Sequence, residues 1–189
     1  MKLNLPNKLT LARIIITPVF LLVIMWEGLA HRFLIADVIF VIASITDAVD
    51  GRLARKYNEV TNFGKLLDPI ADKILTTAAL LAFLQLGLCN VWIVMIVLTR
   101  EFAISSIRMI SAANGTVIPA NIFGKIKTAS QMVFTGIIML LCEFESAVAK
   151  TPFTAAQISS FLLWITAILA VVSGIIYIKD SRKYIDYTK

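Results

Sequence analysis

Four aspartates form two pairs at helical spacing, with a short polar segment between the pairs. Asp47 and Asp50 are three residues apart, and Asp68 and Asp72 are four residues apart. Residues at these offsets lie on one face of an α-helix. Carboxylates that share a face can bind a cation together, and all-oxygen ligands suit hard ions such as Mg²⁺ or Mn²⁺. The spacing therefore predicts two facing carboxylate pairs that hold two divalent metal ions.

Two small residues and an arginine accompany the first pair. Gly51 and Ala54 lie four and seven residues after Asp47, which places them on the same predicted helical face. Arg55 follows directly, and its guanidinium can bind phosphate oxygens. Two divalent ions about 3.5–4 Å apart can clamp the attacking and leaving oxygens of a phosphoryl displacement. The pattern favours metal-dependent phosphoryl transfer, with room for a nucleotide beside the metals.

Other interpretations fit the aspartates taken singly. Carboxylates at helix ends commonly act as caps or pair with nearby cations, but four at these offsets, with small residues between them, favour a ligand site. Intramembrane carboxylates also mark ion pathways, so a cation transporter is the alternative from another functional class. Such a pathway needs acidic residues at mid-membrane, where Asp37 and Glu101 are the candidates. We expect these two, with Arg100, to form interhelical ion pairs instead.

Six apolar stretches surround these motifs. Hydrophobic residues make up 59% of the 189 residues, against about 45–50% in a typical soluble domain. Because a transmembrane helix needs about 20 mostly apolar residues, we predict an all-α membrane bundle with six transmembrane helices. It forms a single domain over residues 1–189, with a short interfacial segment at Lys2–Lys8. The predicted spans are Leu9–Trp26, Phe33–Ala54, Leu66–Leu86, Val91–Ile110, Ile122–Leu141 and Ala155–Ile178.

The basic residues predict how the bundle lies in the membrane. If the N-terminus is cytoplasmic, Arg32 and Lys150 lie outside, and the other 16 of the 18 Lys and Arg residues lie at or near the inner face. This asymmetry places both termini and both aspartate pairs on the cytoplasmic side. The net charge of +6 then fits contact with anionic lipid headgroups, and we expect no nucleic acid partner.

The segment from Asp47 to Asp72 reads D-x2-D-G-x2-A-R-x8-G-x3-D-x3-D. This resembles the signature of the CDP-alcohol phosphotransferase family of membrane enzymes. The similarity to one bacterial branch of that family runs from about residue 4 into the fifth predicted span. It is carried by Pro6–Thr10 with Arg13, by Val60–Lys73, and by Gly124–Thr128 with Gln131.

The resemblance implies transfer of the phosphatidyl group from CDP-diacylglycerol to sn-glycerol 3-phosphate, with release of CMP, in the bacterial cell membrane. By position in the motif, Asp47, Asp50 and Asp68 would be the main metal ligands. Asp72 would lie beside the second metal and act as the general base on the glycerol hydroxyl. The resemblance also implies a homodimer. It assigns the contacts with the CDP portion to Gly51, Ala54 and Arg55.

The phosphate of the acceptor needs cationic donors near the metals. Arg108, Lys125 and Lys127 lie at the inner ends of the fourth and fifth predicted spans, and we favour Arg108 and Lys125. The resemblance adds Arg182, because family members place a late arginine at the acceptor phosphate. Each could instead be a basic residue that extends to the inner membrane face. The same metal site would also serve inositol phosphate, serine or phosphatidylglycerol as acceptor, and these remain alternatives.

Overall fold

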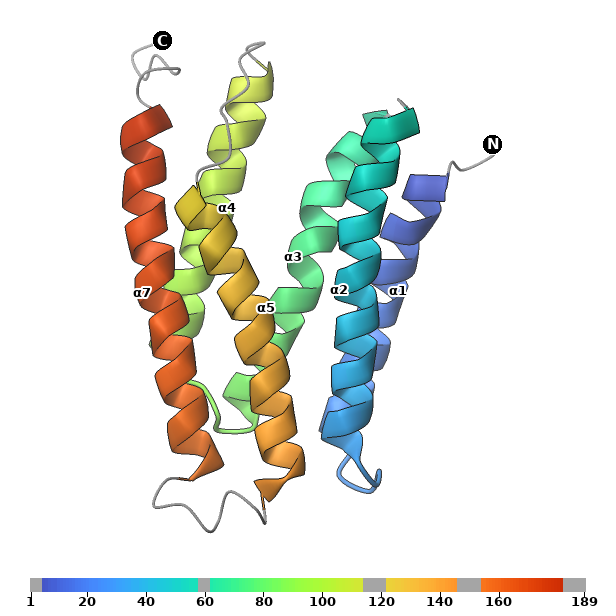
Figure 1. The fold of residues 1–189 in the computed structure, drawn as a ribbon, viewed down its shortest axis with the longest axis vertical. Helices are drawn as coiled ribbons and strands as arrows, with labels where there is room; N and C mark the ends of the chain where they lie inside the picture. Colours follow the sequence, from blue (N-terminus) through green and yellow to red (C-terminus); the bar gives the residue numbers. More distant parts are fainter. Residues whose placement is uncertain (1–4, 58–61, 114–121, 146–153, 182–189) are drawn as a thin grey trace.

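The computed structural model describes residues 5–57, 62–113, 122–145 and 154–181, and of these the side chains other than 5–8, 47–57, 62–70, 72 and 113. The described residues form six helices and no strand, so the predicted all-α class is confirmed. With the labels of Figure 1, the helices are α1 (Leu5–Met25), α2 (Arg32–Tyr57), α3 (Asn62–Gln85), α4 (Val91–Ala113), α5 (Ile122–Glu143) and α7 (Ala155–Ser181).

The helices run up and down along the long axis of the molecule, so their ends gather in two groups (Figure 1). We call one group the motif end, and the opposite group the far end. The motif end comprises the helix ends at Leu5, Tyr57, Asn62, Ala113, Ile122 and Ser181. The far end comprises those at Met25, Arg32, Gln85, Val91, Glu143 and Ala155.

Two of the helices, α1 and α7, each pack closely against two neighbours. α1 packs against both α2 and α3, and α7 packs against both α4 and α5. Contacts of α2 with α5 and of α3 with α4 join the two groups. Within the described residues, α2 and α3 pack against each other more weakly than either packs against α1. The two motif helices are antiparallel, as predicted, but α1 supplies most of the packing that holds them.

The apolar core lies mostly in the half of the bundle near the far end. Phe20, Phe40 and Phe83, from three different helices, are at most 2% exposed. Close packing of these side chains, with few voids between them, stabilises the fold through the summed dispersion contacts. Buried polar side chains occur in both halves: Arg13 and Lys127 lie nearer the motif end, and Asp37 and Ser159 lie nearer the far end. The two halves therefore differ in where the large aromatic rings and the buried basic side chains gather.

The connection between α3 and α4 at the far end shows why these helices stop where they do. Gly87 has φ 73°, a left-handed conformation that ends a helix at little cost when the residue has no side chain. The Leu88 amide donates to the Phe83 carbonyl at 2.9 Å, which closes the last turn of α3. The Asn90 side-chain oxygen then accepts from the Trp92 amide at 2.9 Å and caps the start of α4.

A side chain of α5 ties down the start of α2 at the same end. Glu143 accepts a hydrogen bond from the Leu34 amide at 3.3 Å, where an uncapped helix would leave that donor unsatisfied. Its other carboxylate oxygen lies 2.5 Å from Nδ1 of His31. His31 itself has φ 57° in the turn before α2. The far end is thus closed by contacts between elements that are distant in the sequence.

Two helices, α5 and α7, are long and apolar enough to cross a membrane, by length and composition. Shorter apolar stretches occur at Leu9–Met25 of α1 and Lys73–Gln85 of α3. These findings support a membrane protein, while six membrane-spanning helices remain a prediction. α1 is continuous from Leu5, so residues 5–8 of the predicted interfacial segment form its first turn, and residues 2–4 lie outside the described part.

The helices that carry the aspartates are longer than the spans predicted for them. α2 continues to Tyr57, past the predicted end at Ala54, and α3 begins at Asn62, before the predicted start at Leu66. The predicted limits followed hydrophobicity, and a helix continues into polar sequence where its charged residues can reach water or partners. All four aspartates therefore lie within helices rather than at their last residues.

Candidate active site

Both aspartate pairs lie in helices near the motif end. Asp47 and Asp50 belong to α2, and Asp68 and Asp72 belong to α3. The backbone is helical at all four positions, which meets the condition for each pair to share a face. Two antiparallel helices that bring acidic residues to the same end of the bundle (Figure 1) fit a site for divalent cations. The side chains of these residues, and those of Gly51, Ala54 and Arg55, lie outside the described part, so their roles stay predictions.

α1 places a buried cation beside these two helices. Arg13 is 5% exposed, and it lies in the part of α1 nearer the motif end. Its own carbonyl accepts a hydrogen bond from the Thr17 hydroxyl at 2.9 Å. A guanidinium in the helix that packs against both α2 and α3 could offset the mutual repulsion of the aspartate carboxylates if these face one another as predicted.

A second group of charged side chains lies inside the bundle between α4 and α5. Glu101 of α4 accepts hydrogen bonds from Nη1 of Arg100 at 3.0 Å and from Nζ of Lys127 of α5. Nζ of Lys127 also donates to the side-chain oxygen of Gln131 at 2.6 Å. Lys127 is 1% exposed. We call Arg100, Glu101, Lys127 and Gln131 the Glu101 cluster.

The structure confirms the predicted interhelical ion pair at Glu101 and contradicts the one predicted at Asp37. Glu101 does pair between helices, but its partner is Lys127, a residue we had considered for the acceptor phosphate. Asp37 is buried, and it forms no ion pair within the described residues; its Oδ1 atom has no hydrogen-bond partner there. Gly136 lies against it, since a Cβ at that position would be 3.2 Å from Oδ1. Asp37 therefore lies against a glycine of α5 and not beside a cation of the described residues.

The three residues predicted to bind the acceptor phosphate have different outcomes. Arg108 on α4 and Lys125 on α5 are both exposed and both lie in the turns nearest the motif end. The guanidinium carbon of Arg108 is 6.0 Å from the ring centroid of Tyr177 of α7, a cation–π contact. Arg182 lies outside the described residues. Arg108 and Lys125 are therefore not buried within the bundle, and their role remains a prediction.

The sequence did contain a signal for the buried position of Lys127. Lys127, Gln131 and Thr135 follow one another at intervals of four, and all three are buried in α5. Polar residues at that interval in an otherwise apolar helix mark the face turned towards the other helices. Lys125, two residues earlier, belongs to a different face. The helical period places the two lysines on different faces of α5, although they are close in the sequence and carry the same charge.

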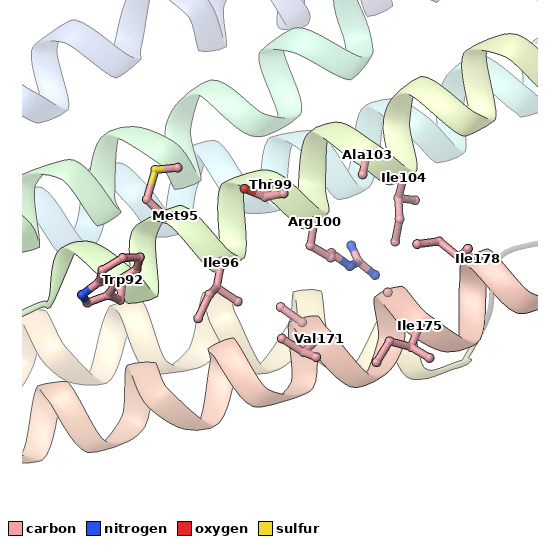
Figure 2. Close-up of a pocket in the computed structure, with 12 residues that line it drawn as sticks. Trp92, Met95, Ile96, Thr99, Arg100, Ala103, Ile104, Val171, Ile175 and Ile178 are labelled. Carbon is pink, nitrogen blue, oxygen red and sulfur yellow. The ribbon is translucent and has the colours of Figure 1, made fainter.

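A groove of about 410 Å³ runs between α4 and α7. Its walls are apolar except near Arg100, whose guanidinium points between the two helices towards Ile175 and Ile178 (Figure 2). Gly174 makes room for this side chain, because a Cβ there would come within 3.3 Å of Cγ of Arg100. The aspartates belong to α2 and α3 instead. The groove is therefore distinct from the predicted metal site.

The helices and the motif together define a class of protein. Residues 3–172 match the family model described as CDP-alcohol phosphatidyltransferase, and the match covers most of the chain, including all four aspartates. The chain belongs to the CDP-alcohol phosphatidyltransferase family, and it is accordingly a phosphotransferase. The resemblance seen in the signature is confirmed.

Curated relatives narrow the comparison within the family. A protein of Bacillus subtilis (strain 168) is 41% identical over 182 residues, which cover 90% of this chain and 91% of the relative. One of Rickettsia bellii is 38% identical over 181 residues, 96% of this chain and 97% of the relative. Both are named CDP-diacylglycerol–glycerol-3-phosphate 3-phosphatidyltransferase. A relative from Mycobacterium tuberculosis (strain H37Rv), 39% identical over 177 residues, 93% of this chain and 80% of that protein, is named probable phosphatidylglycerophosphate synthase.

Proposed function

We propose that this chain transfers the phosphatidyl group of CDP-diacylglycerol to sn-glycerol 3-phosphate, giving phosphatidylglycerophosphate and CMP, in anionic phospholipid synthesis. The observation that carries the proposal is the near full-length similarity to relatives named for this reaction. The uninterrupted aspartate motif on two antiparallel helices supports it. A hydroxyl oxygen of the acceptor attacks the phosphorus that bears the diacylglycerol, and the bond from this phosphorus to CMP breaks.

The aspartates divide this work between binding and proton transfer. Asp47, Asp50 and Asp68 are proposed to hold two divalent ions, Mg²⁺ or Mn²⁺, with Asp72 beside the second. When bound, such ions offset the charge of the pyrophosphate and of the departing CMP. Asp72 takes the proton of the attacking hydroxyl, which is a weak nucleophile until that proton is removed. Gly51, Ala54 and Arg55 are proposed to receive the CDP portion beside the first pair.

The acceptor is proposed to bind at the motif ends of α4, α5 and α7. Its phosphate is a dianion, and charge-assisted hydrogen bonds are the strong contacts for such a group. The exposed side chains of Arg108 and Lys125 support this assignment, and we add Arg182, which follows the last described residue of α7. A serine or an uncharged acceptor would have less use for these cations. The preference for sn-glycerol 3-phosphate therefore rests on them and on the relatives' names.

We also propose that all six helices cross the membrane, with both termini and the motif end in the cytoplasm, and that the protein is a homodimer. Large apolar side chains are exposed on every helix, as lipid-facing surfaces require. Examples are Leu22 of α1, Ile45 of α2, Leu81 of α3, Trp92 of α4, Val133 of α5 and Phe161 of α7. A fluorescent protein fused to the C-terminus should fluoresce, as expected for a terminus in the cytoplasm. A C-terminal alkaline phosphatase fusion that is active would place that terminus outside and refute the orientation.

The reaction can be tested with the full-length protein in detergent. CDP-diacylglycerol, Mg²⁺ or Mn²⁺ and labelled sn-glycerol 3-phosphate should give labelled lipid and an equal amount of CMP. CMP release that requires inositol phosphate, serine or phosphatidylglycerol instead would refute the acceptor. Cation uptake by proteoliposomes, with no CMP release from any acceptor, would favour the transporter and refute the proposed enzyme.

A further inference from the structure

We propose that the Glu101 cluster is a positioning element for acceptor binding: the Glu101–Lys127 pair fixes α4 against α5, and so fixes Arg108 relative to Lys125. This inference rests on the proposed function, which assigns these two residues to the acceptor phosphate. Neither member of the pair is proposed to touch a substrate. The pair acts through the helices that carry the two exposed cations.

The packing of the helices gives the pair this importance. α4 and α5 each pack closely against α7, but within the described residues they pack against each other more weakly than that. The Glu101–Lys127 pair is a direct side-chain contact across this interface. Both charges lie in the bundle, with Lys127 1% exposed and the Glu101 side chain 21% exposed. Buried charges are costly without their partners, so the pair favours one separation of the two helices.

The other members of the cluster hold the two charges in place. Gln131 accepts from Lys127 one turn along α5 at 2.6 Å, which orients the ammonium towards α4. Arg100 donates to Glu101 at 3.0 Å. Two glycines from different helices leave room for Arg100: a Cβ at Gly124 would be 3.2 Å from Nη2, and one at Gly174 would be 3.3 Å from Cγ. The cluster therefore joins α4, α5 and α7.

The cluster lies on the same two helices as the proposed acceptor ligands, further from the motif end than they are. Glu101 and Arg108 are seven residues apart on α4, so they share a face and are separated by about 10 Å along the axis. Lys127 is two residues from Lys125 on α5. Arg108 is also held at Tyr177 of α7, whose ring packs with Ile104. A shift of α4 against α5 at Glu101 would therefore change the position of Arg108 relative to Lys125.

A different role for the same residues makes the opposite prediction. If Lys127 and Arg100 bound the phosphate themselves, Glu101 would compete with the substrate for both cations. Removing its charge would then lower the KM for the acceptor. If Glu101 positions the helices, removing its charge raises that KM. The sign of the change separates a positioning residue from a competing ligand.

The test compares four full-length variants in detergent with the wild-type protein. Glu101→Gln and Lys127→Met should each raise the KM for sn-glycerol 3-phosphate by about tenfold, with kcat at saturating acceptor and the KM for CDP-diacylglycerol changed by less than about twofold. The double variant should be no worse than the worse single variant, because both remove one contact. Glu143→Gln is the matched control: it removes another interhelical carboxylate, at the far end, and should leave the acceptor KM unchanged.

Three results would overturn the inference. They are an acceptor KM that falls or stays constant in Glu101→Gln, equal increases for both substrates, and additive effects in the double variant. If Glu101→Gln does not fold, as judged by its elution and thermal midpoint, Gln131→Met is used, since it loosens Lys127 without removing a charge; it should raise the acceptor KM, and an unchanged KM would refute the proposal. Wild-type protein that does not use sn-glycerol 3-phosphate refutes the proposed function separately.

Discussion

Lys125 and Lys127 are two residues apart in α5, yet one is exposed and the other is almost completely buried. Two residues correspond to a rotation of about 200° around a helix. These two lysines therefore face different surroundings although they carry the same charge. One can meet a soluble anion, while the other neutralises Glu101 inside the bundle. At the scale of single residues, direction on the helix decides function as much as residue type does.

Asp72 is the residue whose proposed role is most specific. Asp72→Asn keeps the size of the side chain and removes its ability to take a proton. We expect kcat to fall by about 10²–10⁴-fold, while binding of CDP-diacylglycerol to the detergent-purified variant stays measurable. Binding by equilibrium dialysis and turnover by CMP release check the two parts. A variant that turns over at the wild-type rate would exclude Asp72 as the general base.

Arg108 should affect the acceptor and spare the donor. Arg108→Ala removes one cation from the proposed phosphate site, so the KM for sn-glycerol 3-phosphate should rise by about 10- to 100-fold while the KM for CDP-diacylglycerol is unchanged. Initial rates at varied acceptor concentration provide the measurement. Arg32→Ala is a suitable control, because Arg32 also stacks on an aromatic ring, that of Phe33 at 4.8 Å, but lies at the far end. Equal effects of both changes would argue against a phosphate site at Arg108.

At the scale of helices, α1 is the common support of α2 and α3. The sequence predicted the helices and the motif well, because hydrophobic runs and three- and four-residue offsets are local properties. It did not predict that α1 supplies most of the packing of the motif helices, or that Lys127 reaches Glu101. These are contacts between distant segments, and several arrangements of α4, α5 and α7 satisfy the same hydrophobic pattern. Asp37 shows the same limit, since its surroundings depend on where Gly136 lies.

The metal site should also link α2 to α3 physically. If Asp47 and Asp50 of α2 and Asp68 and Asp72 of α3 share the ions, adding Mg²⁺ or Mn²⁺ should raise the thermal midpoint of the protein, because a ligand of the folded state stabilises it. EDTA should reverse this rise and abolish CMP release, and added metal should restore both. Thermal unfolding of wild-type protein and Asp68→Ala, with and without metal, is the measurement. A rise that persists unchanged in Asp68→Ala would contradict the shared site.

Considered as a whole, the molecule gathers its large buried aromatic rings nearer the far end, together with the buried Asp37, and its buried basic side chains, Arg13 and Lys127, nearer the motif end. Phe20 and Phe40 meet at the far end with ring centroids 6.1 Å apart, and Phe83 is buried with them in one cluster. Arg13 and Lys127 lie nearer the motif end, and the partners of Lys127 in the Glu101 cluster lie near the middle of α4 and in α5. Stability and substrate binding should accordingly respond to different substitutions.

Phe83→Ala tests this separation. Truncation of a fully buried phenylalanine typically costs about 3–5 kcal/mol of stability, so the thermal midpoint in detergent should fall clearly. The KM values for both substrates should stay at their wild-type values in the protein that remains folded, because Phe83 lies in the last turn of α3, away from the aspartates. Unfolding curves and initial rates on the same preparation give both quantities. An acceptor KM that rises with the loss of stability would show that the two halves are coupled.

Among the helices that the structure describes, the two supporting helices, α1 and α7, come first and last in chain order. α1 leaves the ribosome before α2 and α3, so both aspartate helices can pack on a finished neighbour while the chain is still growing. α4 and α5 each pack against α7, which follows them in the chain, so this packing can form only after α7 has been synthesised. The donor side of the proposed site can thus assemble early, and the acceptor side can be completed only after α7 has been synthesised. A nascent chain that has been synthesised to the end of α3 would already carry the entire aspartate motif.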